Sequence, residues 1–356
     1  MSKITKTASG FIISFINWAA LVWSVLYLVL GFYWLYGGGG FPFGTQSDPS
    51  ATISALSHVT REGGALYVVS VAGLATIIAI LLLMKVYFLK AIHLVLCSGL
   101  SLLIIFLLLV VPDYRVLVAV AYAPLFLIGA PFGWPAAHFS DAIPWPVINQ
   151  LLCILGGVLW SFALLIYLRR RRKACLYCGR RTRASSWTSP ESAKKWGTWA
   201  VVVAAIVPVF YAATRWAWGL GIPLGIPFDF WQEGYENGMW WAGAGLASMA
   251  VGGAILTIGL IRPWGEIFPR WTLFLKGRRV PPAVAIVPAT FVSILVTSAG
   301  LMFVRLVLEG SFPFLSTGWG TVVPELLWPI WGITLAIATL AYYYRRRGRC
   351  SHCGRM

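Results

Sequence analysis

The chain has 356 residues, of which 59% are hydrophobic and 11% are charged, and its mean hydropathy is +0.79. Several apolar runs are long enough to cross ~30 Å of hydrocarbon, which excludes an ordinary soluble domain and predicts a multi-pass membrane protein. The formal net charge of +17 argues for anionic lipid headgroups as neighbours and not for nucleic acid, because Lys and Arg mark the cytoplasmic loops of membrane proteins.

The first apolar run, from Phe11 to Tyr36, follows a basic N-terminus and contains no small-residue cleavage site. It therefore predicts a first spanning helix and not a removed signal. Hydropathy predicts an all-α polytopic membrane protein with eight transmembrane helices, arranged as two parallel four-helix repeats. In chain order the predicted spans cover residues 11–36, 65–84, 93–111, 147–168, 196–218, 239–261, 281–306 and 326–344.

The segment from Val116 to Phe132 is also apolar, but counting it as a span would move the arginines after residue 168 to the outside. We interpret it as a re-entrant segment or an outer-surface hairpin, broken by prolines at positions 112, 124, 131 and 135. Such a segment is tolerated at membrane depth only where it is buried against protein.

The distribution of charge predicts the orientation. With both termini in the cytoplasm, 24 of the 28 Lys and Arg residues lie inside, and 9 of the 11 acidic residues lie outside. Orientation follows the lysine and arginine bias, so we expect a protein of the cell membrane with both ends cytoplasmic.

Short matches recur in the same order in both halves, which indicates an internal duplication. Tyr33–Gly37 matches Arg215–Gly219, Phe41–Phe43 matches Ile226–Phe228, and Trp145–Pro146 matches Trp328–Pro329. The predicted domains are a first repeat over residues 1–179, a cytoplasmic linker over 180–195 and a second repeat over 196–356. An even number of spans in each copy makes the repeats parallel, an arrangement that places functional sites at the repeat interface in some transporters.

The segment from Leu26 to Gly40, with its Tyr-Trp followed by glycines, resembles the first helix of an uncharacterised family of small four-helix bacterial membrane proteins. That family's motif is roughly H-x-Y-W-x-x-G-G, and this chain has Gly31 at the position of the histidine. The resemblance covers about one helix in each half. It implies that a four-helix unit was duplicated and fused, and it implies no activity.

Each repeat ends in arginines followed by C-x-x-C-G, which brings Cys175, Cys178, Cys350 and Cys353 to the expected cytoplasmic face. Four thiolates in two such turns are typical of a structural zinc site. Redox-active dithiols and cysteines that act independently are alternatives. His352 is expected to be a solvated neighbour of the ion, and Cys97 and Cys153 to be small apolar residues within spans.

The expected outer face holds four basic residues, of which Arg115 and Arg305 occupy corresponding places after the third span of each repeat. We predict a shared ligand-binding site of arginines, carboxylates and aromatic walls, with Trp218 and Trp231 as further walls. The alternative is that these groups form interfacial salt bridges that close the bundle. His58 and His138, with Asp48 or Asp141, form a weaker candidate for a metal or acid–base group. The predicted ligand-binding residues are Tyr33, Trp34, Arg115, Asp141, Arg215, Trp216, Arg305, Glu309 and Glu325.

No nucleotide-binding loop, G-x-S-x-G or H-E-x-x-H motif is present, which counts against an ATP-driven pump or a familiar hydrolase. Three functions stay open. The first is a transporter or binder of a small lipophilic or neutral molecule at the repeat interface. The second is a scaffold or accessory subunit that docks a cytoplasmic protein. The third is a membrane-embedded enzyme that uses the outer arginines and carboxylates.

Overall fold

The computed structural model describes residues 3–86, 90–129, 131, 143–181, 186–270, 272, 274–311 and 318–355. Its side chains are described from residue 13 onward, except those of residues 124–129 and 186. Within these ranges the chain is helical, and the β-type pairing found there is one isolated bridge between Ile267 and Arg279. The all-α prediction is confirmed.

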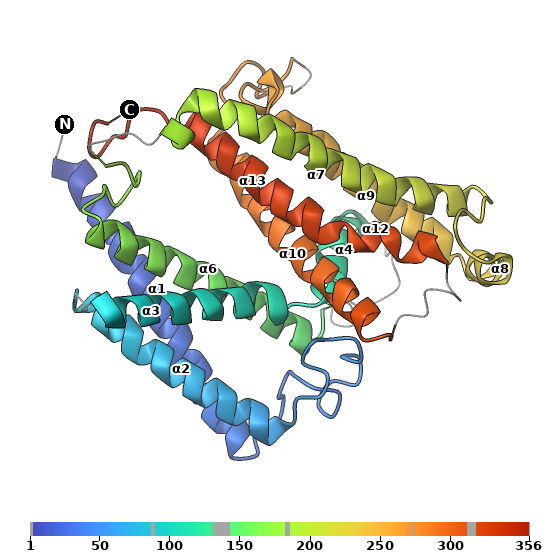
Figure 1. The fold of residues 1–356 in the computed structure, drawn as a ribbon, viewed down its shortest axis with the longest axis horizontal. Coiled ribbons are helices and arrows are strands. Elements are labelled where there is room, and N and C mark those ends of the chain that lie inside the picture. The colour runs from blue at the N-terminus through green and yellow to red at the C-terminus, as the bar shows by residue number, and fades with distance from the viewer. Residues whose placement is uncertain are drawn as a thin grey trace. The chain divides into compact units, whose positions relative to one another are not determined.

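Among the described residues, eight helical segments are long and apolar enough to cross a membrane, and they coincide with the eight predicted spans. Each presents large apolar side chains on its surface, for example Leu74, Leu102 and Trp199, as expected of helices surrounded by lipid. The long helices are α1 (Lys3–Leu35), α2 (Arg61–Leu83), α3 (Lys90–Ile105) continued by the π-helix η1 (Phe106–Val110), α6 (Trp145–Arg171), α7 (Pro190–Gly219), α9 (Met239–Gly259), α10 (Pro282–Leu308) and α13 (Trp328–Arg346) (Figure 1).

The shorter helices connect these spans. They are α4 (Tyr114–Gly129), η3 (Ser186–Thr188), α8 (Phe228–Glu236), η4 (Pro263–Gly265), η5 (Trp319–Thr321) and α12 (Val323–Leu326). Local sequence sets several helix starts. The Thr60 side chain accepts a hydrogen bond from Gly63 N–H at the start of α2, and Ser189 does the same for Ser192 at the start of α7. These caps satisfy backbone donors that have no partner inside the helix.

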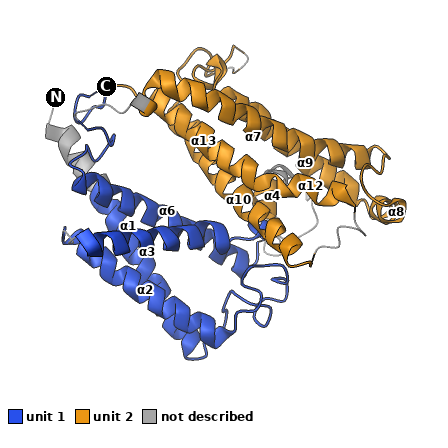
Figure 2. Cartoon of the chain, viewed as in Figure 1, with its two compact units in different colours: residues 1–116, 137–183, 349–356 blue, residues 117–136, 184–348 orange. Residues whose placement is uncertain are grey.

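The chain forms two compact units that differ from the predicted repeats in two segments (Figure 2). Unit 1 contains residues 1–116, 137–183 and 349–356, and unit 2 contains residues 117–136 and 184–348. Most of α4, which follows the third span, therefore belongs with the second set of helices. The last eight residues belong with the first set. The repeat boundaries stay a prediction.

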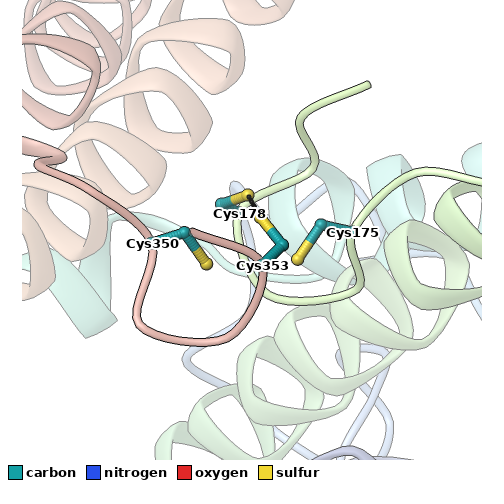
Figure 3. A group of neighbouring side chains, drawn as sticks. All are labelled: Cys175, Cys178, Cys350 and Cys353. Atoms are coloured by element: carbon teal, nitrogen blue, oxygen red, sulfur yellow. Dashed lines mark hydrogen bonds between the residues drawn. The ribbon is translucent and has the colours of Figure 1, made fainter. Parts of the chain in front are cut away.

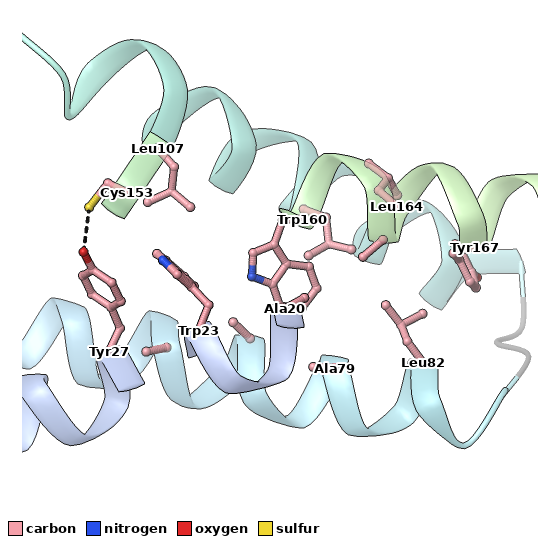
Figure 4. Packing of buried hydrophobic residues seen from close by; sticks show 14 of the residues in the cluster. Ala20, Trp23, Tyr27, Ala79, Leu82, Leu107, Cys153, Trp160, Leu164 and Tyr167 are labelled. Atoms are coloured by element: carbon pink, nitrogen blue, oxygen red, sulfur yellow. Dashed lines mark hydrogen bonds between the residues drawn. The ribbon is translucent and has the colours of Figure 1, made fainter. Parts of the chain in front are cut away.

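In unit 1, α1 packs against α2 and α6, and α3 packs against α6. The buried cluster combines large aromatic side chains from α1 and α6, such as Trp23, Tyr27 and Trp160, with small residues of α2, such as Ala72 and Ala79 (Figure 4). Small residues let the backbones of membrane helices approach closely, and the aromatic rings fill the space between them.

In unit 2, α7 packs against α9 and α13, and α10 packs against α13, which is the same order of contacts as in unit 1. The α10–α13 contact is close, because a Cβ at Gly332 would collide with Thr297 and with the carbonyl oxygen of Ser293. A Cβ at Gly197 of α7 would likewise collide with Ala341 of α13. Glycine therefore sets the distance between helices in this unit.

The ends of α1 and α7 share one geometry. Gly37 and Gly221 both have a left-handed backbone, with φ of 94° and 92°, and in each case the next residue donates to the carbonyl five positions back at 2.8 Å. Three residues before each glycine lies a buried tryptophan, Trp34 or Trp218. The place of Trp34 before its glycine is thus that of Trp218, whereas the sequence match pairs Trp34 with Trp216; the repeat itself stays a prediction.

The hairpin predicted over Val116–Phe132 is wrong for residues 116–129, because these form the continuous helix α4. Asp113 caps the start of this helix, because its carboxylate accepts a hydrogen bond from Arg115 N–H at 2.9 Å. The helix continues through Pro124, as membrane helices can where neighbours satisfy the freed carbonyl. Its 16 residues measure about 24 Å, less than the ~30 Å hydrocarbon core. That this segment does not cross stays a prediction, and Phe132 lies outside the described residues.

Candidate metal centre and membrane cavity

The first cysteine turn follows the arginine-rich end of α6. Cys175 N–H donates to the carbonyl of Arg180 at 3.1 Å, and Gly179 N–H donates to the carbonyl of Cys175 at 2.8 Å. Gly179 has φ of 70°, a conformation that favours glycine. Arg169 of α6 donates to the carbonyls of Leu176 and Tyr177, at 2.7 and 3.1 Å, and so fixes the turn to its helix.

The second turn, after α13, repeats this backbone pattern. Cys350 N–H donates to the Arg355 carbonyl and Gly354 N–H to the Cys350 carbonyl, both at 2.9 Å, and Gly354 again has φ of 70°. The two turns also hold each other. Arg180 donates to the carbonyl of Arg355 at 2.8 Å, and Arg355 donates to the carbonyl of Arg180 at 3.0 Å. This reciprocal pair brings equal turns together, as two halves of one binding site require.

The four sulfur atoms meet where the turns face each other (Figure 3). All lie within 4.8 Å of one another, and Cys178 Sγ is 3.6 Å from Cys353 Sγ. A disulfide would need about 2.05 Å, so these are free thiols. Four thiolates around one tetrahedral ion, with metal–sulfur bonds of ~2.3 Å, would lie ~3.8 Å apart. The cluster is therefore compatible with a single bound metal ion.

The thiols of the cluster differ electrostatically. For Cys350, burial opposes ionisation, but backbone N–H groups of Cys353 and His352 donate to its sulfur and lower its pKa to about 7. For Cys178, burial and the neighbouring thiols raise the pKa to about 12. Four thiolates without a cation would repel one another, so a divalent ion that displaces their protons fits the site. His352 itself is exposed and lies against the Tyr177 ring, 4.6 Å between centroids.

The other two cysteines lie apart from this centre. Cys153 is buried in α6, with its sulfur 3.4 Å from the Tyr27 hydroxyl. Cys97 is half-buried in α3, and its sulfur lies 3.5 Å from Nδ1 of His93. Both are free thiols with polar neighbours inside the helix bundle.

In unit 1, Arg115 lies between two buried carboxylates. It contacts Asp113 at 2.6 Å and Asp48 at 2.6 Å, and it also donates to the Ser50 hydroxyl. Gln150 of α6 donates to the same Asp113 carboxylate at 2.9 Å. The sequence separation of 67 residues between Asp48 and Arg115 gives no signal of this pair. It fastens the loop between α1 and α2 to the start of α4.

In unit 2, Arg215 of α7 pairs with Glu325 of α12, and both side chains are buried. Arg215 also donates to the carbonyl of Gly320 at 2.9 Å, and its guanidinium lies over the rings of Tyr211 and Trp218, 4.6 and 4.2 Å from their centroids. Contacts on this many sides hold the arginine rigidly between the two elements.

The remaining predicted site residues are spread out. Arg305 pairs with Glu309 one turn along α10, at 3.1 Å and near the surface. Tyr33 is 55% exposed, and Trp216 donates to the Ser248 hydroxyl at 3.1 Å, whereas Trp34 is buried against Phe41. Trp231 donates to the carbonyl of Trp218 at 3.0 Å, His58 is exposed, and Asp141 and His138 lie outside the described residues. A single site shared by these groups stays a prediction.

Unit 1 also contains a large apolar cavity, which the sequence reasoning missed. Its volume is about 560 Å³, within the range of ~300–1,000 Å³ typical of small-molecule sites. Trp23 and Tyr27 of α1, Ala72 of α2, and Phe106 and Leu107 of η1 form part of its wall. Residues of the loop before α2 close one end. Figure 4 shows the buried side of this wall, with Trp23 and Tyr27 facing Leu107 and Cys153.

The cavity is open to its surroundings on one side, and its wall is mainly apolar. Water is a poor filler, because a buried water needs two to four polar partners and this wall is mainly apolar. A hydrocarbon occupant fits the wall better.

Comparisons with family models, with curated proteins and with solved structures find no match for this chain. The resemblance of Leu26–Gly40 to a four-helix bacterial family therefore stays a prediction. The structure by itself establishes eight helices suited to a membrane and four clustered cysteines compatible with metal binding.

Proposed function

We propose that the protein is an integral membrane protein that holds one structural zinc ion at Cys175, Cys178, Cys350 and Cys353 and binds a small lipophilic molecule. The observation that carries the zinc proposal is the meeting of four sulfurs within 4.8 Å, on two turns of the same backbone design. Zinc suits a closed site of four thiolates, since it is redox-inert and prefers tetrahedral sulfur coordination.

The zinc ion fastens the end of the chain to unit 1. Residues 349–356 belong to this unit although they follow α13 of unit 2. Besides the sulfur atoms, the contacts of the tail with the first turn include the reciprocal bonds of Arg180 and Arg355. Removing the metal should therefore release the tail while the spans, which pack independently of it, stay folded.

Metal analysis of purified protein tests the zinc site. We expect one zinc per chain, strongly reduced in Cys350→Ser and unchanged in the control Cys97→Ser, whose sulfur lies on α3. Trypsin should cut the tail of Cys350→Ser faster than that of the control. A wild-type protein free of zinc, or one loaded with iron, would overturn the zinc assignment, and unchanged zinc in Cys350→Ser would overturn the site.

The orientation that we propose places the cysteine turns in the cytoplasm of a cell whose plasma membrane the protein crosses. The basic residues after α6 and α13 support it, because Lys and Arg are retained on the cytoplasmic side. A reducing cytoplasm also keeps the thiols available for a metal. Labelling of position 187 or 355 from outside intact cells would contradict this orientation.

The proposal of a lipophilic ligand is supported by the apolar cavity of unit 1. The charged groups of the predicted outer site favour a structural role over an enzymatic one, since Arg115, Arg215 and Arg305 each already bind carboxylates. Extraction of the purified protein, followed by mass spectrometry of the extract, tests the proposal. A stoichiometric lipophilic species supports it, and a protein that carries and takes up none contradicts it.

A further inference from the structure

We infer that the cavity of unit 1 is a binding site for one long hydrocarbon chain, acyl or isoprenoid, inserted alongside α2 with its polar end left outside. This inference rests on the proposed lipophilic ligand and gives that ligand a class and a place. It places the site within one helix unit, whereas the sequence predicts the repeat interface.

The shape of the cavity fits a chain. Its wall follows α2 from Thr60 to Ala75, a distance of about 22 Å along a helix axis. One leaflet of the hydrocarbon core measures about half of ~30 Å, so the cavity is long enough for a chain that spans a leaflet. Along α2 the wall combines the small residues Gly63, Ala72 and Ala75 with Tyr67, Val68 and Val71, so it is apolar along most of this length.

The chemistry of the wall excludes a strongly polar ligand. The Tyr27 hydroxyl is engaged with the Asn149 side chain at 2.9 Å, and the Thr60 hydroxyl oxygen accepts from Gly63 N–H at 3.3 Å. Most of the other lining residues are aliphatic or aromatic. A ligand rich in polar atoms would lose its hydrogen bonds to water on entry, whereas a hydrocarbon loses none.

The wall of the cavity is exposed at the start of α2, and we place the entrance there. Thr60 and Gly63 are exposed there, and the Tyr67 ring, 51% exposed, stands edge-on to Phe106 of η1 with 5.7 Å between centroids. These two rings form a contact between α2 and η1. A chain can enter beside this pair and leave its polar end at the level of Thr60, near the membrane boundary.

The loop between α1 and α2 closes the end of the cavity beyond Thr60. Phe43, Leu56 and Val59 of this loop contribute to the wall. The ion pair of Asp48 with Arg115 holds the same loop in place. Because the loop carries part of the wall, the bound chain and the ion pair should stabilise each other.

Adjacent leucines on α3 provide a matched test. Leu103 lines the cavity, whereas Leu102 is 67% exposed on the lipid side of the same helix. The probe is palmitic acid with a photoreactive group near the chain end, added to detergent-solubilised protein and mapped by peptide mass spectrometry. We expect labelling of Trp23, Leu103 and Phe106, at least a tenfold loss in Leu103→Trp, and no loss in Leu102→Trp.

A second pair on α2 covers the case that Leu103→Trp fails to fold. Val71 lines the cavity and Leu74 is 60% exposed, so Val71→Phe should reduce labelling and Leu74→Phe should not. Zinc content and thermal midpoint report folding in every variant. Labelling confined to Leu74 and Leu102, or equal labelling of all four variants, would overturn the site.

The mass of the co-purified species identifies the source of the chain, either a bilayer phospholipid or a free fatty acid or isoprenoid. If a lipophilic species co-purifies but the cavity variants retain it, the chain site is wrong and the proposed function stands. If the wild type neither carries nor takes up any lipophilic species, the proposed function and the chain site both fail.

Discussion

The third long helix is buried to a different extent in the two units. In unit 2, half of the most apolar stretch of α10 is buried (50%), whereas only 11% of the corresponding stretch of α3 and η1 is buried in unit 1. The order in which helices pack is the same in both units. The same order of helix contacts therefore occurs with a half-buried third helix in unit 2 and with a largely exposed one beside a cavity in unit 1.

Residue choice at the contacts explains the difference. The α10–α13 contact has Gly332 against Thr297 and Gly300 against Pro329, so the two backbones lie close. In α3, Gly99 has no atom within 4 Å of the position that a Cβ would take, and the close glycine contact of this segment is at its end, where Gly157 of α6 meets Leu107 and Leu108 of η1. Small residues without a partner on the facing helix do not bring helices together.

Each unit has a buried arginine clamp, namely Arg115 with Asp48 and Asp113 in unit 1 and Arg215 with Glu325 in unit 2. Breaking the clamp of unit 2 should cause the largest loss of stability. Glu325→Ala leaves Arg215 buried without its carboxylate and should cost about 3–5 kcal/mol of stability. Its control is Glu309→Ala, which breaks an exposed pair one turn along a helix and should cost about 0.5 kcal/mol or less. Thermal or denaturant unfolding in detergent measures both. Similar losses in the two variants would show that burial does not decide the strength of these clamps.

The next largest loss of stability is expected where α10 and α13 of unit 2 pack closely. Gly332→Leu forces a side chain into Thr297 and the Ser293 backbone, and overpacking of this kind should cost about 1–3 kcal/mol. Gly99→Leu is the matched control, because a new side chain there meets open space. We expect the control to be within ~0.5 kcal/mol of wild type. If the control is as destabilised as Gly332→Leu, then α3 is packed as tightly as α10.

Much of this fold could be predicted from the sequence, for reasons visible in particular residues. Long apolar runs predict spans because, in hydrocarbon, a helix satisfies every backbone hydrogen bond within one segment. All eight predicted spans were confirmed. The cysteine cluster could be predicted because both turns carry the same short motif. What could not be predicted depends on pairs far apart in the chain. Asp48 with Arg115, and the cavity between α2 and η1, arise from packing that no local pattern encodes.

The proline pattern around α4 shows a second limit. Pro124 predicts a break, but the helix that Asp113 caps at its start is continuous to Gly129. The same Asp-x-Arg sequence that caps the helix also supplies one side of the unit 1 clamp. A cap signal immediately before an apolar run was present in the sequence and would have predicted the start of this helix.

The smallest predicted effect concerns the clamp of unit 1 and its dependence on pH. Burial by itself raises the pKa of Asp48, but hydrogen bonds from Ser50 and the Arg115 guanidinium outweigh it and hold this pKa below its usual value. A lowered native pKa adds stability that is complete above the unfolded pKa of ~3.9 and is lost as pH falls through the native value. Asp48→Asn keeps an acceptor for Ser50 but loses the charge, so it should cost about 1 kcal/mol at neutral pH.

Melting curves of wild type and Asp48→Asn between pH 7 and pH 3 measure this effect. The difference between the two midpoints should be constant from pH 7 to about pH 5 and shrink below ~pH 4, because protonation removes the same charge from the wild type. The control Asp229→Asn, at the start of α8 in unit 2, tests whether any outer carboxylate behaves in this way. A difference that grows in acid would mean that Asp48 is protonated in the native state at neutral pH. In that case Arg115 would be held by Asp113 alone, and the loop beside the cavity would have no ionic clamp.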